Sequence, residues 1–261
     1  MRAPPEPTIR AARLPVASAA AELAARDAVL AGLVARHGPP PARRPVPVSR
    51  RFAALARAIV YQQLAGRAAS AIHARLLAAL EGELTPARVL AAPDEVLAGA
   101  GLSGAKAAAL RDLAEKVATG TVDLGRLGRL PDDEVVARLV QVRGIGTWTA
   151  EMFLLAALGR RDVWPVGDYG VRVGFALAWS LPEVPSPAAL RPLGEPFRPL
   201  RSLVAWYCWR AVESRTDGRD PGALAGPRRG ATLRGDRRQG PRPGTAAGTR
   251  PPSPPRSRAG S

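Results

Sequence analysis

Cysteine and histidine are scarce in this chain of 261 residues. The sequence contains one cysteine, Cys208, and two histidines, His37 and His73. A single thiol cannot close an internal disulfide, and so few scattered ligands do not make up an iron–sulfur or structural zinc site. We therefore expect no metal cluster of this kind. We expect Cys208 to be a small buried residue within an apolar segment.

Long apolar runs are also missing. No segment of the sequence approaches the roughly 20 apolar residues that a membrane-spanning helix needs. The N-terminus lacks the charged, apolar and cleavable series of a secretion signal. We therefore expect a cytoplasmic protein with no membrane partner.

Positive charge is present in excess, and nearly all of it comes from arginine. Lys and Arg total 38 against 22 Asp and Glu, a net charge of +16. Ten arginines and three aspartates lie from residue 217 onward, so that segment carries +7 and the rest +9. This balance favours a polyanionic partner. From composition we expect a flexible N-terminus over residues 1–17, a helical domain over 18–215 and a disordered basic Pro/Gly/Arg-rich tail over 216–261.

Hydrophobic periodicity predicts an all-α protein, because helical spacing recurs along the chain and strand-like alternation is almost absent. Residues 19–36 are predicted to form one amphipathic helix, with Ser18 as N-cap and Gly38 after its end. The predicted domain is long enough for one sizeable core or two small lobes with a cleft between them. Further helices are predicted over 49–63, 67–80, 93–99, 103–119, 131–141, 147–158, 169–179, 187–193 and 196–212.

The segment from Val142 to Thr147, VRGIGT, predicts a turn between two helices in which two glycines flank Ile145. Glycine lets the backbone turn sharply and approach a ligand closely. A helix beginning at Thr147 would point its unpaired N–H groups and positive dipole end into the turn, where a phosphate fits. No strand precedes the turn and no third glycine follows, which excludes a dinucleotide-binding motif. A plain tight turn between helices is the alternative.

A single acid, Asp168, stands just before the helix predicted from Tyr169. Its position suits an N-cap, whose side chain accepts a backbone N–H of the first helical turn. A fixed carboxylate can equally stabilise positive charge that develops on a substrate. The two roles are compatible, so both stay open on the sequence alone.

Five blocks of sequence occur in an order that resembles the helix-hairpin-helix DNA glycosylase superfamily. They are Ala58–Leu64, Gly101–Ser103 with Lys106, Val142–Ala150, Trp164–Asp168, and Pro199–Ser202 with Trp206 and Trp209. Within the superfamily the likeness is closest to the 3-methyladenine DNA glycosylase II branch, which repairs alkylated bases. It runs from about residue 20 to residue 212 and leaves out the basic tail.

This resemblance implies an all-α, two-lobed fold with a DNA-binding cleft between the lobes. It implies a monomeric hydrolase of base excision repair that acts at the nucleoid on double-stranded DNA containing alkylated bases. Such an enzyme flips out 3-methyladenine or 7-methylguanine and hydrolyses its N-glycosidic bond, with no cofactor required. The segment before residue 49 is too short for the N-terminal β domain that some relatives carry, so we expect none.

The resemblance also assigns a catalytic role to Asp168, which would stabilise the cationic transition state at the deoxyribose. Trp148, Tyr169 and Trp209 are expected around the flipped base, because aromatic rings attract a positively charged alkylated purine. Ordinary helix packing is the alternative for Trp209, and for Trp206 packing is the favoured interpretation. Related enzymes that also cleave the DNA backbone carry a nucleophilic lysine where this chain has Trp148, so we expect a monofunctional enzyme.

Two further elements follow from the same resemblance. The DNA-binding hairpin comprises Arg143, Gly144, Ile145, Gly146 and Thr147, with a Na⁺ or K⁺ ion expected at the backbone carbonyls of Val140, Val142 and Ile145. The corner formed by Gln62, Gln63 and Leu64 is the expected position of the wedge that fills the vacated base stack. An ordinary polar helix end is the alternative for that corner.

The sequence departs from the family pattern at two places. Val142-Arg143 replaces the usual Leu-Pro at the start of the hairpin, and Phe197 and Leu200 stand where relatives more often have larger aromatic residues. Two other functions therefore stay open. One is a glycosylase for oxidised or mismatched bases, and the other is a DNA-binding module without catalysis. A general basic nucleic-acid chaperone would explain the tail but not the five ordered blocks.

Overall fold

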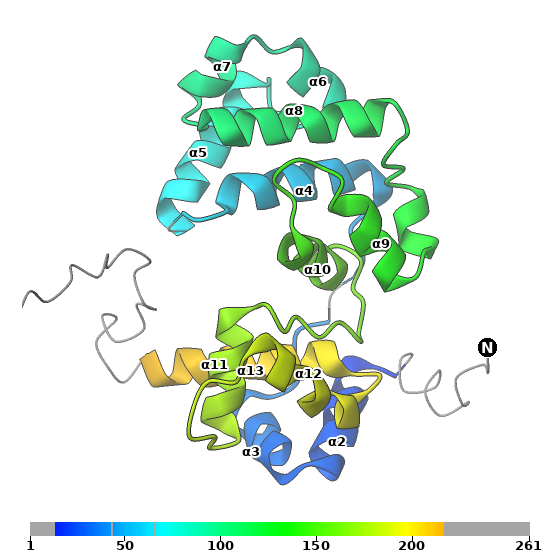
Figure 1. Cartoon of the computed structure of the whole chain (residues 1–261), viewed down its shortest axis with the longest axis vertical. Coiled ribbons are helices and arrows are strands. Elements are labelled where there is room, and N and C mark those ends of the chain that lie inside the picture. Colours follow the sequence, from blue (N-terminus) through cyan, green and yellow to red (C-terminus); the bar gives the residue numbers. More distant parts are fainter. Residues whose placement is uncertain (1–13, 43, 65, 217–261) are drawn as a thin grey trace, which may run out of the picture. The chain divides into compact units, whose positions relative to one another are not determined.

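The computed structural model describes residues 14–42, 44–64 and 66–216, which form an all-helical structure (Figure 1). Within these ranges there are twelve α-helices, two short 3₁₀ helices and no strand, so the predicted all-α class is confirmed. None of the described helices is long and apolar enough to cross a membrane. The expectations for the first thirteen residues and for the tail from residue 217 onward fall outside the described part of the chain.

A first hydrophobic core is built by the middle of the chain, from Phe52 to Val163. Its fully buried residues include Leu55 and Ile59, in the helix Val48–Tyr61, and Leu110 and Leu113, in the helix Gly104–Ala118. The helices of this part are α4 (Val48–Tyr61), α5 (Gly66–Ala79), α6 (Pro86–Ala91), α7 (Asp94–Gly99), α8 (Gly104–Ala118), α9 (Asp132–Leu139) and α10 (Thr147–Ala156), with the 3₁₀ helix η1 (Arg126–Arg129) between α8 and α9.

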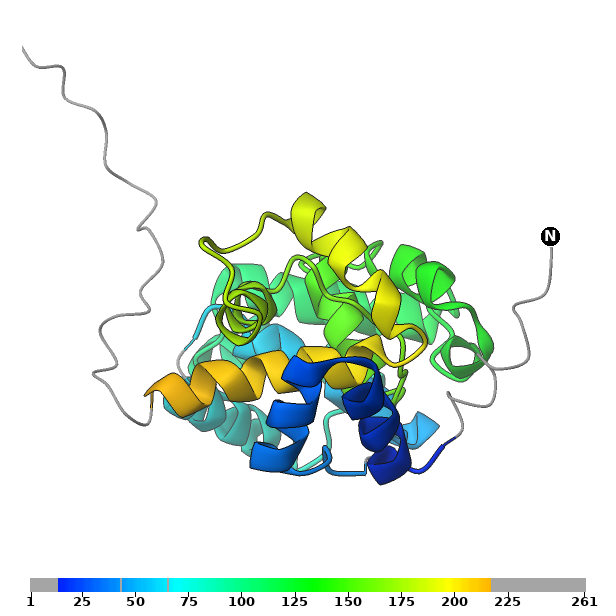
Figure 2. The ribbon, with the colours of Figure 1, turned by 90° about the horizontal axis from the view of Figure 1, so that it is seen from below.

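A second hydrophobic core joins the first helices of the chain to the last ones. Figure 2 shows α13 beside the N-terminal helices, and α13 contacts both α3 and α11. The elements of this part are α2 (Val16–Arg26), α3 (Ala28–His37), α11 (Tyr169–Ala178), α12 (Pro187–Leu193), η2 (Glu195–Phe197) and α13 (Arg201–Thr216). Because this core is discontinuous in sequence, the chain passes between the two cores after α3 and again after α10.

The prediction of a single helix over residues 19–36 is wrong, because Asp27 interrupts the helix. Asp27 has extended backbone angles, and its carboxylate accepts the Leu30 N–H at 2.9 Å as the N-cap of α3. Its other carboxylate oxygen accepts the Trp179 indole N–H at 3.1 Å. The predicted cap Ser18 lies inside α2, which begins at Val16. A tertiary contact to Trp179, the C-cap residue of α11, accompanies this break in the continuous helical pattern.

Helices α11 and α13 cross at a glycine. A Cβ atom added to Gly174 would lie 2.0 Å from the carbonyl oxygen of Cys208, a separation that two packed backbones cannot accommodate. Cys208 is fully buried there, as the sequence predicts, and burial raises the pKa of its thiol. The close crossing matters for function because α11 and α13 each supply a side chain to the candidate site.

Replacing Gly174 by Ala should destabilise the protein by several kcal/mol, because the new methyl group forces α11 and α13 apart. The matched control is Gly32→Ala in α3, where an added Cβ meets nothing within 4 Å. Thermal unfolding of both variants tests this. We expect a large drop in Tm for Gly174→Ala and none, or a small rise, for Gly32→Ala. Equal Tm values for the two variants would contradict the packing argument.

Candidate active site

Asp168 lies at the beginning of α11, after the loop that follows α10. Its carboxylate Oδ1 accepts the Val171 N–H at 2.8 Å, so Asp168 is the N-cap that the sequence suggests. The cap fixes the carboxylate at the positive end of the helix dipole, where negative charge is favoured. The side chain is 8% exposed, so most of its surface is in contact with protein.

Two tryptophans from other helices donate hydrogen bonds to the same carboxylate. Trp148 Nε1, on α10, lies 2.7 Å from Asp168 Oδ2, and Trp209 Nε1, on α13, lies 3.0 Å from Oδ1. The structure therefore brings together the expected acid and two of the three expected pocket aromatics. Three helices meet at one carboxylate, and both of its oxygen atoms have a donor.

All three donors to Asp168 are neutral N–H groups. None of the ion pairs in the described ranges includes Asp168. Hydrogen bonds from neutral donors orient a carboxylate without cancelling its charge. A Cβ on Gly170 would lie 3.1 Å from both Asp168 Oδ1 and Trp209 Cδ1, so the glycine leaves room for the two side chains to meet. The arrangement holds a fixed negative charge among aromatic rings.

The aromatic side chains beside Asp168 differ in exposure. Trp148 is 45% exposed and Tyr169 is 47% exposed, which is unusual for residues of this size. The guanidinium carbon of Arg172 lies 5.5 Å from the centre of the Tyr169 ring. Trp209 is partly buried against the second core. The acid thus borders two accessible rings that a planar ligand can contact.

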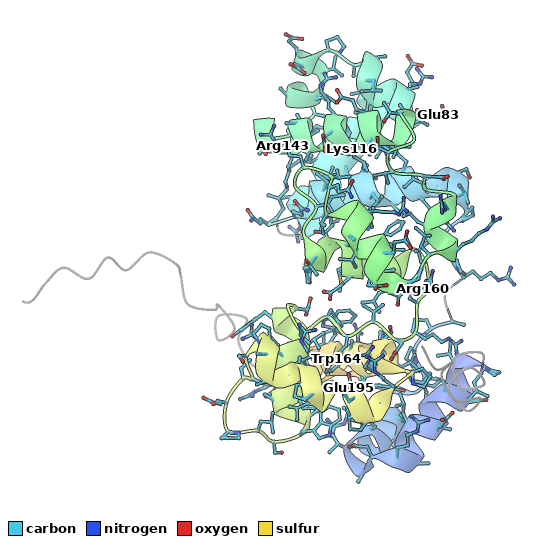
Figure 3. The ribbon with its side chains drawn as sticks, turned by 45° about the vertical axis from the view of Figure 1, so that its right-hand side comes forward. Glu83, Lys116, Arg143, Arg160, Trp164 and Glu195 are labelled. Carbon is cyan, nitrogen blue, oxygen red and sulfur yellow. The ribbon has the colours of Figure 1, made fainter. Side chains whose placement is uncertain are left out.

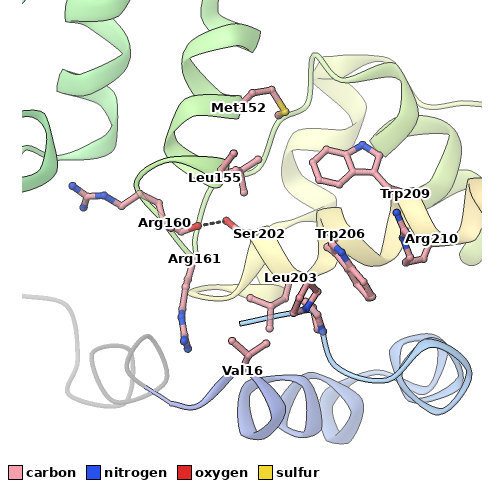
Figure 4. A pocket seen from close by; sticks show the side chains of 14 residues that line it. Val16, Met152, Leu155, Arg160, Arg161, Ser202, Leu203, Trp206, Trp209 and Arg210 are labelled. Atoms are coloured by element: carbon pink, nitrogen blue, oxygen red, sulfur yellow. Dashed lines mark hydrogen bonds between the residues drawn. The ribbon is translucent and has the colours of Figure 1, made fainter. Parts of the chain in front are cut away.

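A pocket of about 370 Å³ adjoins Trp209. Met152 and Leu155 of α10 line it, together with Trp206 and Trp209 of α13 (Figure 4). Asp168 is not among its lining residues. The pocket and the acid therefore share Trp209, whose indole N–H is directed to the carboxylate.

Trp164 and Trp206 have mainly packing roles. Trp164 is buried and donates its indole N–H to the Leu190 carbonyl at 3.0 Å. Trp206 packs edge-to-face on Tyr207, with ring centres 5.0 Å apart, and also borders the pocket. Core packing, which the sequence favours for Trp206, is thus present. Phe197 and Leu200, the two departures from the family pattern, are both buried in the second core.

The VRGIGT turn is an ordered hairpin between α9 and α10. Val142 and Ile145 are buried in the first core, and the Ile145 N–H donates to the Val142 carbonyl at 3.0 Å. Gly144 has φ +76°, a conformation that favours glycine, and a Cβ there would lie 3.0 Å from Ala109 of α8. Arg143, Gly144, Gly146 and Thr147 are exposed. The apolar residues anchor the turn and leave its other residues at the surface.

Helix α8 holds the start of the hairpin. The Arg143 backbone N–H donates to Asp112 Oδ2 at 2.7 Å, and Asp112 forms an ion pair with Lys116. Figure 3 shows Arg143 and Lys116 near one another on this part of the molecule. The hydrogen bond from the Arg143 N–H to Asp112 supports the turn at the position where Val142-Arg143 replaces Leu-Pro.

The corner after α4 lies next to the hairpin. The side-chain amide of Gln62 donates to the Gly144 carbonyl at 2.9 Å, whereas Gln63 and Leu64 are exposed. Of the three carbonyls expected to hold a monovalent cation, that of Val142 already accepts the Ile145 N–H. A carbonyl has two lone pairs, so the turn bond leaves the Val142 oxygen one for an ion.

Comparison with known proteins places the chain in a family. Residues 56–199 match the model of the HhH-GPD superfamily of base excision DNA repair proteins. The chain belongs to this superfamily. DNA-3-methyladenine glycosylase 1 of Schizosaccharomyces pombe is 34% identical over 159 residues, which cover 60% of this chain and 70% of the relative.

Solved structures of superfamily members show the same fold. A 3-methyladenine DNA glycosylase of Schizosaccharomyces pombe in complex with abasic DNA has a TM-score of 0.67 and 31% identity, covering 74% of this chain and 95% of that one. A DNA-3-methyladenine glycosidase from Bacillus halodurans also has a TM-score of 0.67, with 32% identity and coverage of 75% and 89%. The resemblance inferred from the five sequence blocks is confirmed.

Glu151 is an ionisable residue at this HhH-GPD site that the sequence analysis did not predict. Glu151 lies on α10 one turn after Trp148, on the face that also carries Met152 and Leu155. Burial raises the pKa of Glu151 to about 7; Asp168 adds to the rise, and Arg191 opposes it. The three-residue spacing from Trp148 is the signal that places Glu151 on the same face. Its chemistry depends on burial, which the sequence does not show.

The raised pKa of Glu151 gives stability a pH dependence. The folded protein keeps a proton up to pH about 7 that the unfolded chain releases near its ordinary value of 4.5, so the free energy of unfolding falls as pH rises through this interval. Glu151→Gln should remove this fall, so its Tm relative to the parent should be higher at pH 8 than at pH 5. Glu95→Gln, at an exposed position on α7, is the control. Parallel Tm-against-pH curves for Glu151→Gln and the parent would contradict the assignment.

Proposed function

We propose that the protein is a monofunctional DNA glycosylase that removes alkylated purines, among them 3-methyladenine and 7-methylguanine, from double-stranded DNA. The observation that carries the proposal is the Asp168 carboxylate, held by the indoles of Trp148 and Trp209 and by the start of α11. The named activity of the relatives, 3-methyladenine DNA glycosylase, supports this choice of substrate.

Asp168 supplies the electrostatic part of the reaction. As the N-glycosidic bond breaks, positive charge builds on the deoxyribose, and an oriented negative charge beside the sugar lowers the energy of that state. Because its hydrogen-bond donors are neutral, Asp168 offers its charge to the sugar rather than to a protein cation. The same carboxylate can orient the water that attacks the anomeric carbon.

The aromatic rings beside Asp168 select the leaving base. Purines alkylated at N3 or N7 are cationic, so they gain from contact with the electron-rich faces of Trp148, Tyr169 and Trp209, and unmodified purines do not. The indole N–H edges of both tryptophans are directed to Asp168. The ring faces therefore contact the base, while the indole N–H edges bind Asp168.

The hairpin binds the DNA backbone. Gly146 is the N-cap of α10 and has no side chain to cap it, so N–H groups of the first turn are open to a phosphate. Gly144 and Thr147 lie on the same exposed turn. A Na⁺ or K⁺ ion at the carbonyls of Val140, Val142 and Ile145 would strengthen this contact. Leu64, exposed at the corner after α4, is a side chain available to enter the vacated stack.

Trp148 limits the reaction to hydrolysis. It occupies the position that the nucleophilic lysine takes in superfamily members that also cleave the DNA strand. An indole nitrogen cannot form a Schiff base with the deoxyribose. The expected product is therefore the free base and an intact abasic strand.

The Asp168→Asn variant tests the proposal. It keeps the shape and much of the capping of α11 but removes the charge, so single-turnover release of 7-methylguanine should fall by about a hundredfold or more. Chromatographic measurement of bases released from methylated duplex DNA gives this rate, and duplex affinity should persist.

Asp27→Asn provides a matched control. Asp27 also caps a helix and accepts an indole N–H, but it does so at α3, with Trp179 as donor. The same chemical change there should leave base release within about twofold of the parent. If the two variants lose activity equally, the loss comes from weakened helix capping and the catalytic assignment of Asp168 fails.

A further inference from the structure

The corner after α4 is fixed by a lysine from α8. Lys106 Nζ donates to the Val60 carbonyl at 2.7 Å and to the Gln62 carbonyl at 2.8 Å. Helix α4 ends at Tyr61, so the Val60 carbonyl belongs to its last turn and the Gln62 carbonyl to its C-cap residue, where a cation is favoured by the helix dipole. The position at which the chain leaves α4 is therefore set by α8.

Gln62 continues this chain of bonds to the hairpin. Its side-chain Nε2 donates to the Gly144 carbonyl at 2.9 Å and lies 3.2 Å from Thr149 Oγ1. Gly144 is the turn glycine of the hairpin, and Thr149 is buried in the first turn of α10. The Gln62 side chain is thus directed at the hairpin.

Gln63 and Leu64, the next two residues of the corner, are exposed, unlike Gln62. Gln63 has φ +55°, in the left-handed region that non-glycine residues rarely adopt, and its side chain is exposed. Leu64 is 38% exposed. The bonds to Gln62 therefore lie immediately before the exposed part of the corner.

From this geometry, and resting on the proposed function, we infer that Gln62 is a positioning residue that locks the wedge corner to the phosphate-binding hairpin. Lys106 holds the Gln62 backbone, and Gln62 holds Gly144. The exposed Leu64 and the exposed turn of the hairpin then meet the duplex at a fixed separation. A side chain held at a fixed distance from a bound phosphate enters the stack at one defined step, without a search over orientations.

The hairpin does not depend on Gln62 alone. It keeps the bond from the Arg143 N–H to Asp112 and the buried side chains of Val142 and Ile145. Loss of the Gln62 amide should therefore disturb the entry of the wedge more than the binding of phosphate.

A fluorescent duplex tests the inference without catalysis. The duplex carries a tetrahydrofuran abasic analogue next to 2-aminopurine, whose fluorescence rises when its neighbours unstack. At saturating protein, Gln62→Met should reduce the rise at least about threefold, while affinity for an undamaged duplex changes by less than about twofold. Adding Leu64→Ala should reduce the signal in the parent but not further in Gln62→Met.

Gln141→Met is the matched control, because it makes the same substitution at an exposed position beside the hairpin. Its signal should equal that of the parent. Lys106→Met should reproduce the loss seen in Gln62→Met, and Lys106→Arg, which keeps cationic donors, should restore most of the signal. Thermal unfolding establishes that each variant is folded.

Three outcomes would overturn the inference. They are an unchanged signal in Gln62→Met, an equal loss of affinity for undamaged duplex, and a further loss on adding Leu64→Ala to Gln62→Met. Failure of the unaltered protein to release alkylated bases, with unstacking intact, counts against the proposed function and leaves the inference standing. No unstacking by the unaltered protein would overturn both.

Discussion

The structure depends on one carboxylate that receives hydrogen bonds from three helices. Asp168 caps α11, and the indoles of Trp148 on α10 and Trp209 on α13 donate to its two oxygen atoms. Helix α10 belongs to the first hydrophobic core, and α11 and α13 belong to the second. The acid is therefore a polar contact between the two cores, and its orientation depends on the packing of both. The close crossing at Gly174 holds α11 and α13 together, so a packing feature and the site share the same helices.

A comparison within the molecule shows what separates a structural acid from a candidate catalytic one. Asp27 and Asp168 both cap a helix and both accept an indole N–H. The difference lies in the neighbours. Trp179 stacks on Phe175 with ring centres 4.1 Å apart, whereas Trp148 beside Asp168 is 45% exposed. What distinguishes the candidate catalytic acid is therefore the accessible aromatic surface beside it, which a ligand can contact.

Local sequence signals predicted much of this arrangement. Apolar periodicity predicted most of the helices, but it missed α6 and merged α2 with α3. The glycines of the VRGIGT segment predicted the hairpin, and the position of Asp168 before α11 predicted its cap. Contacts between distant segments escaped prediction, because no local pattern records them. The break at Asp27 is accompanied by a hydrogen bond from Trp179, the bond of Gln62 depends on Gly144, and the pKa of Glu151 depends on burial. The resemblance to the family named Trp148 and Trp209 as pocket residues, but only the structure shows that their indole N–H groups bind the acid.

The most direct test of this account is a double-mutant cycle between Trp209→Phe and Asp168→Asn, measured as single-turnover release of 7-methylguanine. Trp209→Phe keeps the aromatic ring but removes the N–H that orients the carboxylate. If Trp209 acts through the charge of Asp168, the substitution should slow release by about tenfold in the parent and have little effect in the Asp168→Asn background. The same factor in both backgrounds would show that the two residues act independently, and would contradict the claim that an oriented carboxylate at this contact performs the chemistry.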